Sequence, residues 1–199
     1  MRVLLVGATG TIGRAVAAAL GERHEVVAVS RSSGAHRADI EDAASIARLY
    51  GAVGPVDAVV CTAGRGQFGP LAQLDDAAYW LAFESKLKGQ VNLVRHGLRH
   101  LARGGSFTLT SGVLAQQPAP GSTSLTPANA AVEWFARAAA LELGDHRINV
   151  VSPGWVSETL ALMGMDPDHG TPAEVVARTY LRAVEGRMTG QVLAVEEEA

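Results

Sequence analysis

The sequence predicts an α/β protein with a doubly wound, mostly parallel sheet and helices on both faces. Apolar runs typical of buried strands alternate with segments of helical period along the whole chain. The first of these runs leads directly into a turn with three glycines and then into a helix. A length of 199 residues suits a single hydrophobic core, so we treat 1–199 as one domain.

Composition narrows the classes of function. A hydrophobic content of 48% and a net charge of −3 are typical of a globular protein, and the basic residues form no stripe for nucleic acid. Cys61 is the only cysteine, which excludes an internal disulfide and a cysteine-rich metal site, so we expect no metal. The first residues enter a strand directly, so we expect no signal peptide, and the sequence has no apolar run of membrane length. We therefore expect a cytoplasmic location and no membrane partner.

The first strand, Val3–Val6, is followed by glycines at Gly7, Gly10 and Gly13. Residues without Cβ allow backbone N–H groups to close on a phosphate at the positive end of the next helix. Apolar residues of that helix recur at helical spacing: Ile12, Val16, Ala19 and Leu20. An ordinary tight turn is the alternative, but the flanking strand and helix favour a dinucleotide site.

A second strand, Glu25–Val29, ends in a segment that predicts which dinucleotide binds. An NAD site normally carries an acid here that hydrogen-bonds the ribose 2′-hydroxyl. This chain has Arg31 followed by Ser32, and a guanidinium suits a 2′-phosphate. The pattern favours NADP(H) over NAD(H); the alternative is a solvated loop arginine.

The middle of the chain predicts a short strand at Arg37–Ile40, a helix at Asp42–Tyr50 and a buried strand at Val56–Cys61, with Cys61 as a small core residue. Residues 65–74 are expected to form a loop. One long helix is then expected from Asp75 to about Arg103, ended by Gly104 and Gly105. Its apolar stripe predicts core packing or a subunit interface and consists of Trp80, Phe83, Leu87, Val91, Val94, Leu98 and Leu101.

The second half alternates in the same way. Strands are expected at Ser106–Thr110, Arg147–Val151 and Gln191–Val195, and helices at Ala128–Leu143 and from Pro172 to about Glu185. A loop is expected at Gln116–Pro127 and a mobile segment over a site at Glu158–Thr171. The chain ends in an acidic tail.

These motifs, in this order, resemble the short-chain dehydrogenase/reductase superfamily, and the chain resembles an atypical short member of it. The resemblance rests on the glycine turn, on Asp39-Ile40 at the adenine, on Cys61-Thr62-Ala63-Gly64, on Arg147–Gly154 beside the nicotinamide and on Thr189-Gly190-Gln191. It implies a single Rossmann domain that binds NADP(H). The implied cofactor-binding residues are Gly7, Thr9, Gly10, Thr11, Ile12, Gly13, Arg31, Ser32, Asp39, Ile40, Thr62, Ala63, Gly64, Asn129, Pro153, Gly154 and Val156.

The family's reacting residues match less well. Its chemistry uses a tyrosine as general acid and base, a lysine that lowers the tyrosine pKa, a serine and an upstream asparagine. In this chain Leu125 occupies the tyrosine position, Asn129 the lysine position and Lys86 the upstream asparagine position, while Ser111 remains. The chain's three tyrosines, Tyr50, Tyr79 and Tyr180, are predicted in helices away from the site loop.

Lys86 and Ser111 are thus the candidate catalytic residues, beside a water or a group on the substrate. Desolvation next to a nicotinamide would lower the pKa of Lys86 and suit it to act as an acid, whereas the alternative is a surface helix lysine. Ser111 either bonds substrate or cofactor or caps the strand end. Asn129 either starts its helix or bonds the nicotinamide ribose.

Two functions follow from the resemblance. The first is an NADP-dependent oxidoreductase that moves hydride between NADP(H) and a small-molecule carbonyl or alcohol, with a non-standard proton relay. The alternative is a non-catalytic NADP-binding protein, either a redox-responsive regulator or a partner subunit. The long helix around residues 75–103 resembles the family's subunit contact, which implies a homodimer or homotetramer.

Overall fold

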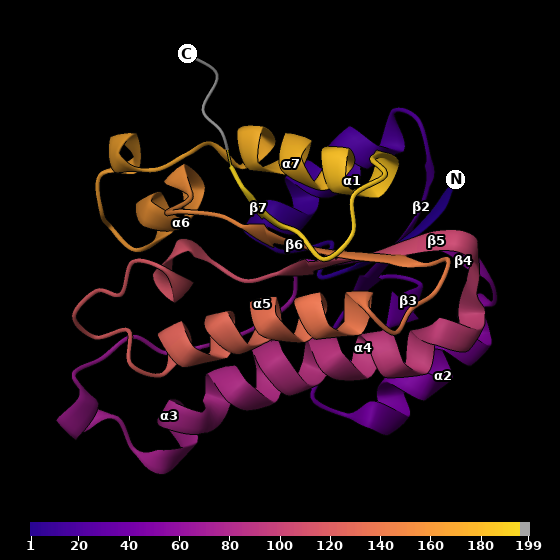
Figure 1. Cartoon of the computed structure of the whole chain (residues 1–199). Coiled ribbons are helices and arrows are strands. Elements are labelled where there is room, and N and C mark those ends of the chain that lie inside the picture. Colours follow the sequence, from indigo (N-terminus) through magenta and orange to yellow (C-terminus); the bar gives the residue numbers. More distant parts are fainter. Residues whose placement is uncertain (196–199) are drawn as a thin grey trace.

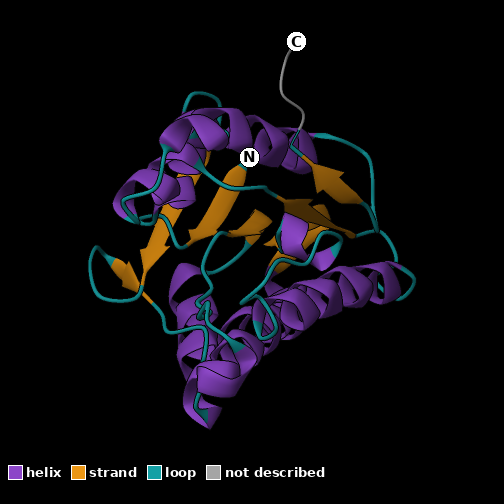
Figure 2. Cartoon of the chain, turned by 90° about the vertical axis from the view of Figure 1, so that its left-hand side faces the viewer, coloured by secondary structure: helices purple, strands orange, loops and turns teal. Residues whose placement is uncertain are grey.

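The computed structural model describes residues 1–195, so the acidic tail lies outside the described residues. Among these residues, seven strands form one sheet in which every neighbouring pair is parallel, in the order β3-β2-β1-β4-β5-β6-β7 (Figures 1 and 2). The strands are β1 (Arg2–Val6), β2 (Glu25–Ser30), β3 (His36–Arg37), β4 (Val56–Cys61), β5 (Leu101–Thr110), β6 (Arg147–Ser152) and β7 (Val192–Ala194). The predicted doubly wound fold is confirmed.

Helices cover both faces of the sheet (Figure 1). They are α1 (Thr11–Gly21), α2 (Ala43–Val53), α3 (Asp76–Ala82), α4 (Gly89–Gly97), α5 (Leu125–Ala140), α6 (Ser157–Leu162) and α7 (Ala173–Glu185). Helices α2, α4 and α5 lie on one face, and α1 and α7 on the other. Residues alternate along β1, so Leu4 and Val6 join the core under α2, α4 and α5, whereas Val3 and Leu5 join the core under α1 and α7.

The order of the strands places a crevice at the carboxyl ends of the strands. The chain leaves β1 toward β2, and it leaves β4 toward β5 on the other side. Connections therefore diverge between β1 and β4, and ligands of such sheets bind beyond the carboxyl ends of the strands at this point. The segments that follow β1, β4, β5 and β6 all end at this edge and can supply a common site.

The prediction of a single long helix from Asp75 to about Arg103 is wrong. Helix α3 passes into a π-helical turn at Phe83–Lys88 and then into α4, and β5 already begins at Leu101. Glycines 104 and 105 lie inside the strand, where Gly104 has φ +75° and a Cβ on Gly105 would lie 2.6 Å from the carbonyl oxygen of Asp57. The glycines thus allow an irregular, close strand pairing and do not cap a helix.

The predicted stripe on this segment is also interrupted. Val94 is buried, but Trp80 is 53% exposed and Leu98 is 37% exposed. The extra residue of the π turn rotates the residues before it relative to those after it, so one straight stripe cannot continue.

Other boundaries moved by a few residues. Helix α5 begins three residues earlier than expected and ends at Ala140, because Leu125 to Pro127 already belong to its first turn. The segment Glu158–Thr171 contains most of α6 and a short 3₁₀ turn, and the loop at 65–74 contains another 3₁₀ turn. Strand β3 is limited to His36–Arg37, so Asp39 and Ile40 follow it.

Strand β4 is buried up to its carboxyl end. Cys61, the last residue of β4, is fully buried, and burial raises the pKa of its thiol to about 12. The prediction that it is a core residue is confirmed. No helix within residues 1–195 is long and apolar enough to span a bilayer.

Candidate active site

The glycine turn brings the ends of β1 and β4 into close contact. Gly7 has φ +94°, and a Cβ there would lie 2.6 Å from the backbone nitrogen of Ala63. A Cβ on Gly13 would lie 1.9 Å from the carbonyl oxygen of Gly7. The first turn of α1, which the structure describes in full, carries no acidic side chain and no side-chain cap. Its N–H groups and helix dipole can therefore serve an anion.

A cavity of about 260 Å³ extends from this turn toward β2 and β3, and we call it the nucleotide cavity. The predicted cofactor residues on its wall are Gly7, Thr9, Gly10, Arg31, Asp39, Ile40, Thr62, Ala63 and Gly64. Arg31 is exposed at the rim. Three further predicted residues, Thr11, Gly13 and Ser32, do not line it; Gly13 acts through its contact with Gly7.

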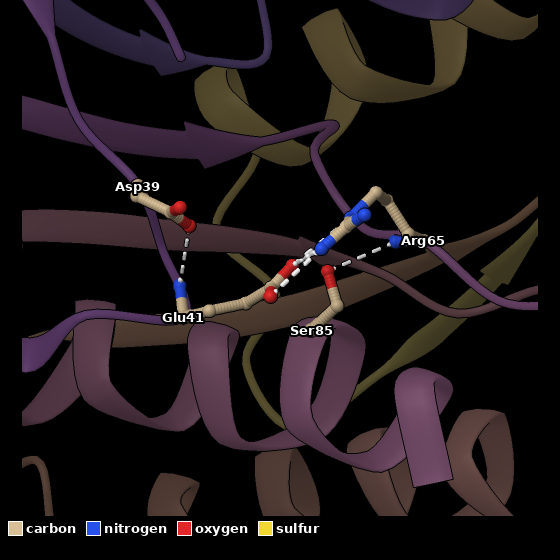
Figure 3. Close-up of polar contacts among 4 residues, drawn as sticks. All are labelled: Asp39, Glu41, Arg65 and Ser85. Carbon is tan, nitrogen blue, oxygen red and sulfur yellow. Dashed lines mark hydrogen bonds and ion pairs between the residues drawn. The ribbon is translucent and has the colours of Figure 1, made fainter. Parts of the chain in front are cut away.

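Glu41 and Arg65 form an ion pair on the wall of the nucleotide cavity, which we call the clasp (Figure 3). Arg65 Nη2 donates to both carboxylate oxygens at 2.7 and 2.8 Å, and Nε donates to Oε1 at 3.0 Å. The backbone nitrogen of Arg65 donates to Ser85 Oγ at 3.0 Å. The clasp thus ties together the segment after β3, the segment after β4 and the π turn.

The carboxylate of the clasp is held in its charged form. Partial burial raises the pKa of Glu41, but hydrogen bonds with Arg65 and Ser85 outweigh burial and keep the pKa below its usual range. Both residues were absent from the predicted site. The available signal was position, since Glu41 directly follows Asp39-Ile40 and Arg65 directly follows Ala63-Gly64.

A second cavity of about 300 Å³ lies beyond the carboxyl ends of β4, β5 and β6, and we call it the reaction cavity. Thr62, Ala63 and Gly64 line both cavities, so the two adjoin. The other predicted residues on its wall are Ile12, Lys86, Ser111, Leu125, Asn129, Pro153, Gly154 and Val156. Unpredicted residues there are Thr110, Gly112, Val113, Leu114, Trp155 and Thr159.

Lys86 enters the reaction cavity from the π turn. Its ammonium nitrogen donates to the carbonyl oxygen of Ser111 at 3.1 Å, and its side chain passes over Gly64, where a Cβ would lie 2.7 Å from Lys86 Cγ. Burial lowers the pKa of Lys86 to about 8. The half-buried position contradicts the interpretation of Lys86 as a surface helix lysine.

The hydroxyl of Ser111 donates a hydrogen bond to a buried carboxylate. Ser111 Oγ donates to Glu133 Oε1 at 2.7 Å, and the amide of Gln116 donates to Glu133 Oε2. Glu133 is 6% exposed, and both of its carboxylate oxygens accept a hydrogen bond. Glu133 was absent from the predicted site, although it lies four residues after Asn129 and so on the same face of α5.

The end of β5 that carries Ser111 is fixed from three sides. Gln90 exchanges two hydrogen bonds of 2.8 Å with the backbone of Thr110. The Thr110 hydroxyl donates to the carbonyl oxygen of Cys61 and lies 2.6 Å from the hydroxyl of Tyr180. These bonds fix the position of Ser111 relative to Lys86, because Gln90 follows Lys86 by one helical turn and bonds the residue before Ser111.

Asn129 lies in the second turn of α5, so it does not start the helix. It is 2% exposed, and its Oδ1 has no hydrogen-bond partner among residues 1–195. A buried polar atom without a partner calls for an explanation, and because Asn129 lines the reaction cavity a ligand is a candidate partner.

The tyrosines are closer to the site than expected, although none of the three lines either cavity within the described residues. Tyr50 donates to the carbonyl oxygen of Leu93 in the core. Tyr180 contacts Thr110, and burial raises its pKa. Tyr79 donates to the carbonyl oxygen of Thr123 in the loop between β5 and α5. Leu125 forms part of the wall of the reaction cavity.

A parallel doubly wound sheet with this glycine turn and these adjoining cavities defines a Rossmann-type domain. A family model described as enoyl-(acyl carrier protein) reductase matches residues 7–195. The chain belongs to the short-chain dehydrogenase/reductase superfamily, as the resemblance of its motifs indicated.

Two curated relatives are a dehydrogenase and a reductase by name. A cis-4-hydroxycyclohexanecarboxylate dehydrogenase from Sinomonas cyclohexanicum is 30% identical over 93% of this chain and 82% of its own length. Versicolorin reductase 1 from Aspergillus parasiticus is 29% identical over 80% of this chain and 71% of its own length.

Two solved structures have a similar fold and similar length. The Listeria innocua protein lin1944 has a TM-score of 0.93 and 39% identity, with 98% of this chain and 100% of that chain covered. A small-chain dehydrogenase crystallised with NADPH has a TM-score of 0.89 and 31% identity, with 98% and 96% covered.

Proposed function

We propose that this protein is an NADP(H)-dependent oxidoreductase that acts on a carbonyl or alcohol group of a small, largely apolar molecule. The observation that carries the proposal is the convergence of Lys86, Ser111 and Asn129 on a cavity that adjoins the nucleotide cavity. A protein that only binds a nucleotide needs neither a half-buried lysine nor a second cavity beside the nicotinamide end.

The residues present suit a dinucleotide phosphate. The N-terminus of α1 and the close glycine turn accept the pyrophosphate, since a Cβ at Gly7 or Gly13 would close that space. Asp39 and Ile40 hold the adenine, and Arg31 at the rim suits the 2′-phosphate. The unpartnered Oδ1 of Asn129 suits a hydrogen bond donated by a hydroxyl of the nicotinamide ribose. The NADPH-bound relative supports the same choice of cofactor.

When bound, NADPH supplies the hydride. The chain's own residues supply polarity at the substrate oxygen. The Lys86 ammonium faces the reaction cavity and stabilises negative charge that develops on that oxygen, and Ser111 positions it. Apolar walls formed by Ile12, Leu125 and Trp155 exclude water and favour an uncharged alicyclic or aromatic substrate.

The non-catalytic alternative has its own support. Leu125 and Asn129 replace the two residues on which proton transfer in the family depends, and no tyrosine within residues 1–195 lines the reaction cavity. A redox-responsive regulator or partner subunit would bind NADP(H) without turnover.

Parallel calorimetric titrations with NADPH and NADH come first, followed by a screen for NADPH oxidation with alicyclic ketones, aromatic ketones and 9,10-phenanthrenequinone. Tight NADPH binding with turnover supports the oxidoreductase. Tight binding without turnover on any carbonyl supports the regulator. Absence of binding to either cofactor would overturn both and leave the glycine turn as a scaffold.

A further inference from the structure

We propose that Glu133 stores the proton of the reaction and exchanges it with the substrate through the hydroxyl of Ser111. This inference rests on the proposed oxidoreductase function. It assigns the source of the proton, which the loss of the family's tyrosine leaves open. The observation behind it is the hydrogen-bonded chain from the reaction cavity to Ser111 Oγ and on to Glu133 Oε1.

The direction of the Ser111 hydrogen bond defines what the serine can do. Its single proton points to the Glu133 carboxylate at 2.7 Å, so its lone pairs remain for the cavity. In this state Ser111 accepts a hydrogen bond from a substrate alcohol and cannot donate one to a ketone. A carboxylate behind the serine therefore sets the relay for removal of a proton, and a protonated Glu133 sets it for delivery.

The relay balances in both directions. In ketone reduction, a C–H bond forms with the hydride of NADPH, and the π electron pair moves to the carbonyl oxygen. That oxygen takes the Ser111 proton while Ser111 Oγ takes the carboxyl proton of Glu133, which leaves alcohol, NADP⁺ and a Glu133 carboxylate. Alcohol oxidation reverses each transfer. Transfer through one intervening group is within the reach of general acid–base catalysis.

The proton returns to Glu133 from solvent water, because the amide of Gln116 holds Oε2 by a hydrogen bond and does not itself transfer a proton. Glu133 Oε2 accepts from Gln116, which is exposed in the loop between β5 and α5. Glu133 thus lies between a residue of the reaction cavity and an exposed loop residue, since Oε1 accepts from Ser111 and Oε2 from Gln116. Lys86 bonds the carbonyl oxygen of the same serine and keeps its separate electrostatic role.

Turnover of NADPH with 9,10-phenanthrenequinone tests the relay. Glu133→Gln keeps the volume and one acceptor but removes the exchangeable proton, so we expect kcat to fall about 100-fold or more with little change in NADPH affinity. Glu133→Asp should recover part of the rate. Glu142→Gln is the matched control, because Glu142 is an exposed acid just beyond the same helix. Melting temperatures and NADPH titrations establish that each variant is folded.

A double-mutant cycle separates a relay from a purely structural bond. If Glu133 acts through Ser111, then Ser111→Ala and the double variant should lose about as much rate as Glu133→Gln alone. Losses that multiply would overturn the relay.

Infrared difference spectroscopy gives a readout on the protein without cofactor. The spectrum of the wild-type protein minus that of Glu133→Gln should contain the bands of the Glu133 carboxyl group, and Ser111→Ala should shift them, because Ser111 is the hydrogen-bond partner of that group. A band that Ser111→Ala leaves unchanged would overturn the coupling. Wild-type turnover matched by Glu133→Gln would overturn the relay alone, whereas wild-type protein inactive on every carbonyl would overturn the proposed function together with the relay.

Discussion

Arg65 donates three hydrogen bonds of 2.7 to 3.0 Å to the carboxylate of Glu41 on the wall of the nucleotide cavity (Figure 3). The two residues follow different strands, β3 and β4, so the ion pair sets the distance between two loops that line the same cavity. Because the pair is bidentate, its geometry is better defined than that of most surface ion pairs.

Removing the clasp should weaken cofactor binding. We expect Glu41→Gln to raise the dissociation constant of NADPH about three- to tenfold, since the loops lose their fixed spacing while Arg31 is untouched. Calorimetric titration measures this. Because folding lowers the pKa of Glu41, the clasp is fully formed at neutral pH and is lost as the pH falls through the folded value. Equal affinities of variant and wild type at neutral pH would exclude a role for the clasp in binding.

Lys86 should control turnover and its pH dependence. Lys86→Ala is expected to abolish NADPH oxidation and to spare NADPH binding, because the ammonium faces the reaction cavity and not the nucleotide cavity. In the wild-type protein, carbonyl reduction should decline as the pH rises through about 8, where the ammonium loses its proton. Initial rates at constant ionic strength check the profile between pH 6 and 10, which is about two pH units on either side of that pKa. Unchanged turnover in the variant would remove Lys86 from the mechanism.

The same burial predicts a stability effect. Between about pH 8 and the unfolded value of 10.5, the unfolded chain binds a proton at Lys86 that the folded chain does not, so stability should rise with pH in this window. Lys86→Met keeps the length of the side chain and removes the charge. Its melting temperature should lack this rise, and a rise of equal size in both proteins would assign it to another group.

Two glycines of α1 provide a test of the glycine turn and its control: Gly13 packs against the turn, and Gly21 does not. A Cβ at Gly13 would lie 1.9 Å from the carbonyl oxygen of Gly7, whereas a Cβ at Gly21 meets nothing within 4 Å. We expect Gly13→Ala to cost about 1–3 kcal/mol of stability and to abolish NADPH binding. Gly21→Ala should be neutral or slightly stabilising in thermal melts. Tight NADPH binding by Gly13→Ala would show that the turn can relax.

Arg31 should select between the two dinucleotides. Arg31→Ala is expected to weaken NADPH binding about 10- to 100-fold and to leave NADH binding unchanged, because only the 2′-phosphate offers the guanidinium a charged partner. Arg37→Ala is the control, since Arg37 is exposed on β3 but does not line the nucleotide cavity. Parallel loss of both cofactors, or of neither, would exclude Arg31 as the selector.

The fold could be predicted from the sequence because buried parallel strands and amphipathic helices have distinct periods. The error at residues 75–103 arose where two local signals misled. A π turn leaves apolar spacing almost unchanged over short stretches, and Gly104-Gly105 resembles a helix end although it permits close strand pairing.

The nucleotide cavity was easier to predict than the reacting groups. Gly7, Arg31 and Asp39 follow strands closely, so their place at the sheet edge follows from topology. Glu133 has no such marker, because a glutamate on a helix is normally solvated and only the packing of α5 against β5 buries it beside Ser111. The clasp likewise depends on two loops whose spacing no local pattern encodes.

Cys61, the single thiol of this chain, is fully buried at the end of β4. Its reactivity can therefore report local opening of the sheet. Cys61 is uncharged at neutral pH and is shielded on all sides, so a thiol reagent reacts with it only when the centre of the sheet separates. The reaction rate therefore measures how often that separation occurs. Because Thr62, Ala63 and Gly64 directly follow the thiol on the wall of both cavities, any molecule bound there should slow the reaction, with no label or introduced cysteine.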